Sequence, residues 1–322
     1  MRFVVFGAGG VGGYFGARLA RAGQDVTVVA RGAHLDALRR QGLRVRSAVE
    51  GEYVVSVRAV DHVDGLPPAE VVLLCVKSFD TESALEALRP LIAPETAVLS
   101  LQNGVDNEET IDTVLGPGHA LGGVAYVFAG IESPGVIAHT FAGRIVFGEM
   151  DGRLTPRAER LRQALAAAGI PAQLSPDIRR ALWEKYLMIS AQAGMTALTR
   201  CPIGVIRDTP ETWWLYRMIV EELAALGRAA GVALPPDAVE TVMDQARGLA
   251  PHLYSSLHHD LTQGKRLELE ALHGHAVRLG ERLGVPTPSV FAVYAALKPV
   301  AVRGEPRPGG EPSGEMAREQ GK

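Results

Sequence analysis

The sequence predicts an N-terminal α/β domain with a doubly wound parallel sheet, followed by an all-α C-terminal domain. In the first third of the chain, short aliphatic runs alternate with helical stretches, which is typical of a parallel sheet covered by helices on both faces. From Ile178 onward nearly every segment has a helical pattern, punctuated by Pro or Gly. The length of 322 residues also fits two domains, at roughly 150 residues each. We place the domains at residues 1–175 and 176–302.

The elements of the first domain follow from its apolar runs. Continuous aliphatic segments without polar alternation predict buried strands, and they lie at Arg2–Phe6, Asp25–Ala30, Val71–Val76 and Ala97–Leu101. Helices are expected at Tyr14–Ala22 and Gly32–Gln41, each followed by a glycine that ends it. The Gly- and β-branched-rich stretch Leu121–Glu149 predicts strands and hairpins that complete the domain.

The second half begins after a helix at about Thr155–Ala168 and a short run at Pro171–Leu174. Ser175-Pro176-Asp177 has the pattern of a helix start with proline in the first turn. The helices expected beyond it are Ile178–Thr199, Pro210–Ala230, Pro236–Arg247 and Lys265–Leu283. Residues 303–322 hold only two apolar side chains, Met316 and Ala317, and are expected to form a disordered tail.

Composition excludes several classes of function. The charge is nearly balanced, with 33 Lys and Arg against 36 Asp and Glu, so no global positive field attracts nucleic acid. No apolar run approaches the ~18 residues of a membrane span, and the apolar start of the chain ends at Phe6, too early for a signal peptide. Two distant cysteines, Cys75 and Cys201, suit a reducing compartment. We expect a cytoplasmic protein without nucleic-acid or membrane partners.

The strongest chemical signal is a glycine motif directly after the first strand. The motif G-x-G-x-x-G separates that strand from a helix, which is the context of a dinucleotide-binding loop. In such loops the first glycine permits the tight turn, the second admits the pyrophosphate and the third allows close helix packing. The free N–H groups of the helix N-terminus bind the phosphates. The expected cofactor-binding residues of the motif are Gly7, Ala8, Gly9, Gly10, Val11 and Gly12.

The end of the second strand indicates which dinucleotide binds. Sites for NAD place a carboxylate there to bind the ribose 2′-hydroxyl. The strand instead ends in Val29-Ala30-Arg31, and an arginine can pair with a 2′-phosphate through charge-assisted hydrogen bonds. We therefore predict NADPH as the cofactor and Arg31 as its phosphate ligand, against the alternative of a solvated surface arginine.

Seven segments in order resemble the ketopantoate reductases (2-dehydropantoate 2-reductases). They are GAGGVGGYFGARLA, VVARGAHLDALR, LLCVKSFDT, SLQNGVDNEE, RIVFGE, SPDIRRALWEKYL and SSLHHDLTQGKRLELEALHGHAVRLGERLGVPTP. The resemblance extends from Met1 to about Leu297. It implies a Rossmann-type domain, a helical second domain, and an active site in the cleft between them. The implied reaction is NADPH-dependent reduction of a 2-keto acid to a 2-hydroxy acid in pantothenate biosynthesis. A homodimer stays open as the assembly.

Lys185 matches the family's catalytic lysine, and the sequence supports a chemical role independently. The helix that carries it is apolar nearly all round, so the ammonium group lies where charge is costly. Burial lowers a lysine pKa toward values useful for proton transfer. The alternative is a lysine whose ammonium group extends past apolar neighbours to water.

Glu268 matches the family's active-site glutamate. On a helix over Lys265–Leu283 it would lie within the apolar stripe, whereas Glu270 would face water. We expect Glu268 to bind a substrate hydroxyl and position Lys185, or else to form a structural ion pair.

Three further residues match family positions. Asn103 and Lys77 each follow a predicted strand, at the sheet edge where open α/β folds bind ligands. The resemblance assigns both to the cofactor and the substrate. It assigns Ser256 to the substrate carboxylate, and Asp260 to a motif role that is either structural or a helix start. A turn and a solvated loop are the alternatives for Asn103 and Lys77.

The sequence departs from the family where two asparagines usually hold the substrate. Ile189 and Ala193 occupy those positions, and Gln192 lies close by. This departure keeps a more apolar 2-keto acid open as the substrate. A dinucleotide sensor without turnover is a further alternative, which a buried Lys185 and Glu268 would disfavour. His258 and His259 diverge on a helix and no HExxH spacing occurs, so we predict no metal.

Overall fold

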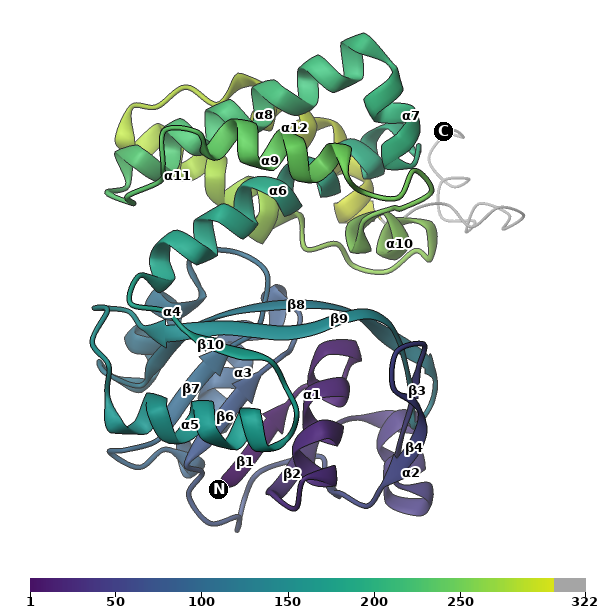
Figure 1. Ribbon diagram of the computed structural model, residues 1–322, viewed down its shortest axis with the longest axis vertical. Coiled ribbons are helices and arrows are strands. Elements are labelled where there is room, and N and C mark those ends of the chain that lie inside the picture. Colours follow the sequence, from purple (N-terminus) through teal and green to yellow (C-terminus); the bar gives the residue numbers. More distant parts are fainter. Residues whose placement is uncertain (304–322) are drawn as a thin grey trace, which may run out of the picture.

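The computed structural model describes residues 1–303 and consists of a mixed ten-stranded sheet with flanking helices and a helical region after it (Figure 1). The sheet order is β4-β3-β9-β8-β7-β6-β1-β2-β5, with β10 paired to β9. The expected fold class, a doubly wound α/β domain plus a helical region, is confirmed. Of the expected tail, residues 304–322 lie outside the described part of the chain, and its first residue, Arg303, ends the last helix.

The doubly wound part consists of parallel strands in the order β7-β6-β1-β2-β5. Alternate residues of β1 face opposite layers, as the period of a strand requires. Phe3 and Val5 pack with helices α1 and α5, and Val4 and Phe6 pack with α3 and α4. The bounds of the strands are Arg2–Phe6 (β1), Asp25–Val29 (β2), Arg58–Val60 (β5), Val71–Leu74 (β6) and Ala97–Ser100 (β7). The helices are Gly10–Arg21 (α1), Gly32–Gln41 (α2), Thr81–Leu88 (α3), Asn107–Leu115 (α4) and Pro156–Ala167 (α5).

The other half of the sheet is built on a long hairpin. Strands β8 (Ala120–Ser133) and β9 (Val136–Glu149) are antiparallel, and β8 joins the parallel half through β7. Beyond β9 lie β3 (Leu43–Ser47) and β4 (Gly51–Val55), with β10 (Ala172–Leu174) also on β9. The sheet is therefore mixed rather than wholly parallel.

The helical region begins with α6 (Ile178–Thr199), whose bounds are the predicted ones. Asp177 caps it by accepting a hydrogen bond from the backbone N–H of Arg180. The helices that follow are α7 (Ile203–Asp208), α8 (Pro210–Ala229), α9 (Ala238–Arg247), α10 (Ser256–Thr262), α11 (His275–Leu283) and α12 (Pro288–Arg303). Short 3₁₀ turns occur at Ser78–Asp80 and Arg89–Leu91, and a π-helical turn at Glu270–Gly274.

One expected helix begins later than predicted. The apolar stripe suggested a helix from Lys265 to Leu283, but residues 265–268 form a loop and the π-helical turn and α11 come after it. Gly264, with φ of +63°, ends the turn after α10, and the loop then passes the sheet so that Glu268 meets Ser78. Glu268 is therefore a loop residue, although its burial was predicted correctly.

Candidate functional site

The sheet brings four of the predicted residues to one edge. Gly7, Arg31, Lys77 and Asn103 come shortly after β1, β2, β6 and β7, which are neighbours and parallel. The carboxyl ends of parallel strands share an edge, and ligands bind where the chain turns away in opposite directions from neighbouring strands. Here that point lies between β1 and β6, so a ligand there would have Arg31 on one side and Lys77 and Asn103 on the other.

The glycine loop has the geometry of a phosphate cradle. Gly7 has φ of +103°, and a Cβ there would lie 2.8 Å from the backbone nitrogen of Val76. A Cβ on Gly12 would lie 2.2 Å from the carbonyl oxygen of Gly7, so only glycine allows α1 this close to the loop. A Cβ on Gly9 would meet nothing within 4 Å, which leaves open space beside the N-terminus of α1. These residues fit a dinucleotide pyrophosphate.

Arg31 stands at the end of this edge, after β2. It is exposed and is the N-cap residue of α2. The position is the one where a ribose carboxylate ligand is expected in NAD sites. An exposed guanidinium there can meet a phosphate without first breaking a buried ion pair.

Lys77 joins the sheet edge to the helical region. Its Nζ lies 2.8 Å from Oε2 of Glu268 and 2.8 Å from Oδ2 of Asp260. The backbone N–H of Ser78 donates a 3.0 Å hydrogen bond to Oε1 of Glu268. Burial acts to lower the pKa of Lys77, but the two carboxylates outweigh it and the pKa is raised. Glu268 is only 6% exposed, so its charge is compensated mainly by groups of the sheet edge.

Lys185 lies on α6 between the sheet and the helical core. On one side of it, Ile178 and Leu182 pack against Val124 and Val146 of the hairpin. Burial lowers the pKa of Lys185 to about 8, although the carboxylate of Glu268 acts to raise it. The lysine is therefore an ammonium group that can release its proton near neutral pH, as a general acid must.

Asn103 and Ser256 are placed near this region without a direct bond to Lys185 or Glu268 within residues 1–303. Asn103 is partly buried, and its carbonyl accepts a hydrogen bond from the side chain of Asn107. Ser256 is the exposed first residue of α10, and the cap of that helix is Ser255. The hydroxyl groups of Thr196 in α6 and Ser255 share a 2.7 Å hydrogen bond, which fixes the start of α10 beside α6.

The sequence did not indicate what holds Glu268. The ion pair between Lys77 and Glu268 was not predicted, and neither was the ion pair between Lys77 and Asp260. Their separations along the chain are 191 and 183 residues, so no local pattern reports the contact. The available signal was indirect, because a buried carboxylate requires a cation or several donors, and Lys77 was already expected at the sheet edge.

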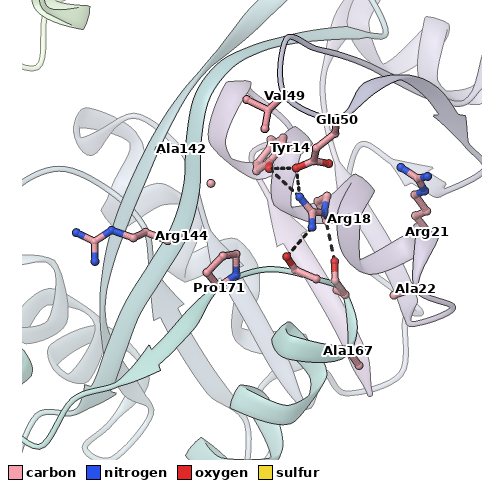
Figure 2. A pocket seen from close by; sticks show the side chains of 13 residues that line it. Tyr14, Arg18, Arg21, Ala22, Val49, Glu50, Ala142, Arg144, Ala167 and Pro171 are labelled. Carbon is pink, nitrogen blue, oxygen red and sulfur yellow. Dashed lines mark hydrogen bonds and ion pairs between the residues drawn. The ribbon is translucent and has the colours of Figure 1, made fainter.

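Two pockets lie on the described surface. One of about 790 Å³ is bounded by α1, the turn after β3 and the loop after α5, and contains none of the predicted site residues. Figure 2 shows Arg18 at its centre, held by Tyr14, Glu50 and the carbonyl oxygens of residues 168 and 169. The other, of about 560 Å³, has Glu268 in its wall between α3, α4 and α12. The pocket of about 790 Å³ is therefore not the predicted active site, and Glu268 lines the pocket of about 560 Å³.

Membrane and metal features are absent from the part of the chain that the structure describes. None of the helices in residues 1–303 combines the length and apolarity of a membrane span. In the same residues no group of three or more His, Cys, Asp or Glu side chains is arranged to hold a metal ion.

Comparison with known proteins gives matches over almost the whole chain. The family model "Ketopantoate reductase PanE/ApbA" matches residues 3–152, and its C-terminal counterpart matches residues 177–301. The 2-dehydropantoate 2-reductase of Mesorhizobium japonicum is 32% identical, with 94% of this chain and 98% of that protein covered.

Solved structures agree with this match. A PanE/ApbA family ketopantoate reductase from Ralstonia eutropha has a TM-score of 0.87 at 35% identity, with 94% of this chain and 99% of that chain covered. D-mandelate dehydrogenase in a ternary structure with NADH and anilino(oxo)acetate has a TM-score of 0.87 at 21% identity, with 94% and 99% covered. This second likeness concerns the fold alone.

Proposed function

The chain belongs to the ketopantoate reductase family and is an oxidoreductase that acts on a CH–OH group with a nicotinamide cofactor, and on this premise we propose that it reduces 2-dehydropantoate to pantoate with NADPH. Relatives of that printed name cover nearly the whole chain. Pantoate formation would place the enzyme in pantothenate biosynthesis. The proposed domain division is residues 1–175 for the cofactor and 176–302 for the substrate.

The observation that carries the proposal is the state of Lys185. Its pKa of about 8 results from burial between two packed regions, with Glu268 as the opposing influence. A ketone becomes an alkoxide as hydride arrives, and a nearby ammonium group stabilises that charge and supplies the proton. A protein that only sensed the dinucleotide would have no need of a desolvated acid at this place.

The proposed roles of the site residues follow from their positions. When bound, the reduced nicotinamide supplies the hydride. Lys185 donates its proton to the carbonyl oxygen of the substrate, and Glu268 binds a substrate hydroxyl and keeps Lys185 protonated. Asn103 and Ser256 orient the substrate, and Lys77 holds Glu268 at the sheet edge. Closure of the two regions over the substrate would exclude water.

For the cofactor, we propose that residues 7–12 hold the pyrophosphate and Arg31 holds the 2′-phosphate of NADPH. Support comes from the open space at Gly9, the free N-terminus of α1 and the exposure of Arg31. Lys77 and Asn103 lie on the opposite side of the switch point, toward the nicotinamide end.

A second substrate class is favoured by one observation. Ile189 and Ala193 carry no side-chain hydrogen-bonding group, and Ala193 is buried in the apolar core of the helical region. A more apolar 2-keto acid would gain about 0.8 kcal/mol for each CH₂ that it buries.

A steady-state assay separates these alternatives. Oxidation of NADPH is followed by absorbance with 2-dehydropantoate, 2-ketoisovalerate and longer 2-keto acids, and each assay is repeated with NADH. The proposal expects the highest kcat/KM for 2-dehydropantoate with NADPH. Faster reduction of the apolar acids would establish the second class, and no turnover of any 2-keto acid would refute the proposed reaction.

A further inference from the structure

Gln192 lies on the same face of α6 as Lys185, two turns further along the helix. Seven residues at about 100° each bring two side chains to within about 20° of each other, and the rise places them about 10 Å apart along the axis. Side chains on a helix lean toward its N-terminus. The amide of Gln192 therefore leans toward Lys185.

The face of α6 between Lys185 and Gln192 lies between two contacts that the helix makes with neighbouring elements. Toward the N-terminus of α6, Leu182 is covered by the hairpin strands. Toward its C-terminus, Thr196 is bonded to Ser255 at the start of α10. Between these contacts Lys185, Ile189 and Gln192 are each only partly buried. The proposed substrate would lie along this interval, with one end at each polar side chain.

The amide oxygen of Gln192 is buried but has no hydrogen-bond partner within residues 1–303. A buried amide without a partner is costly, and such groups in native proteins usually have a reason. The backbone carbonyl of Gln192 is satisfied by Thr196, so the unmet requirement belongs to the side chain. Its neighbours Ile189 and Ala193 have no polar side-chain atoms that could meet it.

From this arrangement we infer that Gln192, rather than Glu268, whose two carboxylate oxygens are bonded to Lys77 and Ser78, accepts the hydrogen bond of a hydroxyl group on the side chain of the 2-keto acid, and that Gln192 is the specificity-determining residue of the site. This inference rests on the proposed function, because Lys185 must hold the carbonyl end of the same molecule. A hydroxyl group both donates and accepts, so it can pair with either end of the amide. A purely aliphatic side chain would leave the amide oxygen unpaired.

A matched pair of substrates tests the inference. 2-Dehydropantoate and 3,3-dimethyl-2-oxobutanoate differ only by the replacement of the 4-hydroxyl group with hydrogen. The measured quantity is the ratio of kcat/KM for the hydroxylated acid to kcat/KM for the deoxy acid, with NADPH. Sites built to bind a substrate hydroxyl discriminate strongly against the analogue that lacks it.

Gln192→Met is the main variant, since methionine has nearly the same shape without the amide. Gln192→Leu is the second variant, in case one substitution disturbs packing, and thermal melting checks that each is folded. Gln173→Leu in β10, which is exposed, is the matched control. We expect the ratio to fall by about 10- to 100-fold in the Gln192 variants, mainly through loss of the hydroxylated substrate, and to stay at the wild-type value in the control.

The outcomes separate the inference from the proposed function. If the wild-type enzyme reduces both acids equally well, or prefers the deoxy acid, the inference is wrong while the reductase assignment stands. The inference is also wrong, and the reductase assignment still stands, if a folded Gln192 variant keeps the wild-type ratio of kcat/KM values. If the wild-type enzyme reduces neither of these acids nor any other 2-keto acid, the proposed function fails and the inference fails with it.

Discussion

The ammonium group of Lys77 lies 2.8 Å from the carboxylate of Glu268, although 191 residues separate them along the chain. Lys77 follows strand β6, whereas Glu268 belongs to the loop before the π-helical turn. Together with the hydrogen bond from the backbone of Ser78, this ion pair fixes Glu268 relative to the sheet edge. The charge that influences Lys185 is thus held by the part of the chain that we propose binds the dinucleotide.

Replacement of Lys185 by alanine removes the proposed general acid. We expect kcat to fall by about 10²- to 10⁴-fold, the usual contribution of such a group. The affinity for NADPH, measured by fluorescence titration, should stay nearly unchanged because the proposed cofactor contacts lie on residues 1–175. The exposed Lys265, changed to alanine, is the control. A kcat within a few-fold of wild type would reduce Lys185 to a structural role.

The rate of reduction should depend on pH through Lys185. The protonated form is the active one, so kcat/KM should be constant below, and fall as pH rises through, a pKa of about 8. Glu268 acts to raise this pKa, so Glu268→Gln should move the falling limb to lower pH as well as reduce the rate. Profiles of the two enzymes between pH 6 and about 10 provide the check. If kcat/KM falls over the same pH range in Glu268→Gln as in the wild-type enzyme, Glu268 does not influence the pKa of Lys185.

Arg31→Ala tests the choice of cofactor. Loss of one charge-assisted contact to a phosphate is worth about 1.5–3 kcal/mol, or roughly 10- to 150-fold in affinity. We expect this loss for NADPH only, since NADH has no 2′-phosphate. Because Arg31 is exposed, the melting temperature should hardly change. Dissociation constants for both cofactors decide the matter, and an equal loss for the two would exclude the 2′-phosphate assignment.

Two glycines of the loop should respond differently to alanine. Gly12→Ala places a Cβ 2.2 Å from a backbone oxygen, so α1 must move and the melting temperature should drop. Gly9→Ala meets no protein atom within 4 Å, so the fold should survive. Its methyl group would occupy the space proposed for the pyrophosphate, and KM for NADPH should rise. A Gly9→Ala enzyme with wild-type KM would place the cofactor elsewhere.

A buried glutamate outside the proposed site should make stability depend on pH. Glu108 in the first turn of α4 is 3% exposed, and burial raises its pKa from 4.5 to about 7. The folded state thus binds this proton more tightly than the unfolded state. The stabilisation is complete below pH 4.5 and is lost as pH rises through about 7, a change of about 3 kcal/mol. In Glu108→Gln that part of the slope should vanish in urea unfolding measured from pH 5 to 8.

The fold prediction succeeded for elements that are marked by their own residues, and failed for elements that are stabilised by contacts with other strands. Helix α6 was found with its predicted bounds, because a capping aspartate marks its start and apolar residues recur along its 22 residues. Strands β3 and β4 were not predicted, although apolar residues alternate with the charged Arg44 and Arg46 in β3, the pattern of a half-buried strand, and the charged Glu52 lies in β4. Those charges pair with each other and with Glu132 across the strands, a pattern that appears only once the strands are paired.

The sequence predicted the position of a site residue where the helix or strand next to that residue determines the position. The glycine motif and Arg31 follow strands, so their common edge follows from the topology of a parallel sheet. Glu268 was expected to be buried, but on a helix face, and the real cause is a loop that reaches Lys77 and Ser78. The lack of a partner for the amide oxygen of Gln192 within residues 1–303 was also beyond sequence reasoning, because hydrogen-bond satisfaction depends on neighbours from distant segments.

The two ends of helix α6 belong to different layers (Figure 1). Leu182, which packs against the hairpin, would be the pivot of a tilt of the helical region. At 1.5 Å per residue, Lys185 stands about 4.5 Å beyond that pivot and Gln192 about 15 Å beyond it. Any small tilt of the helical region therefore displaces Gln192 about three times as far as Lys185. Such a tilt would change the position of the proposed specificity residue much more than that of the proposed acid.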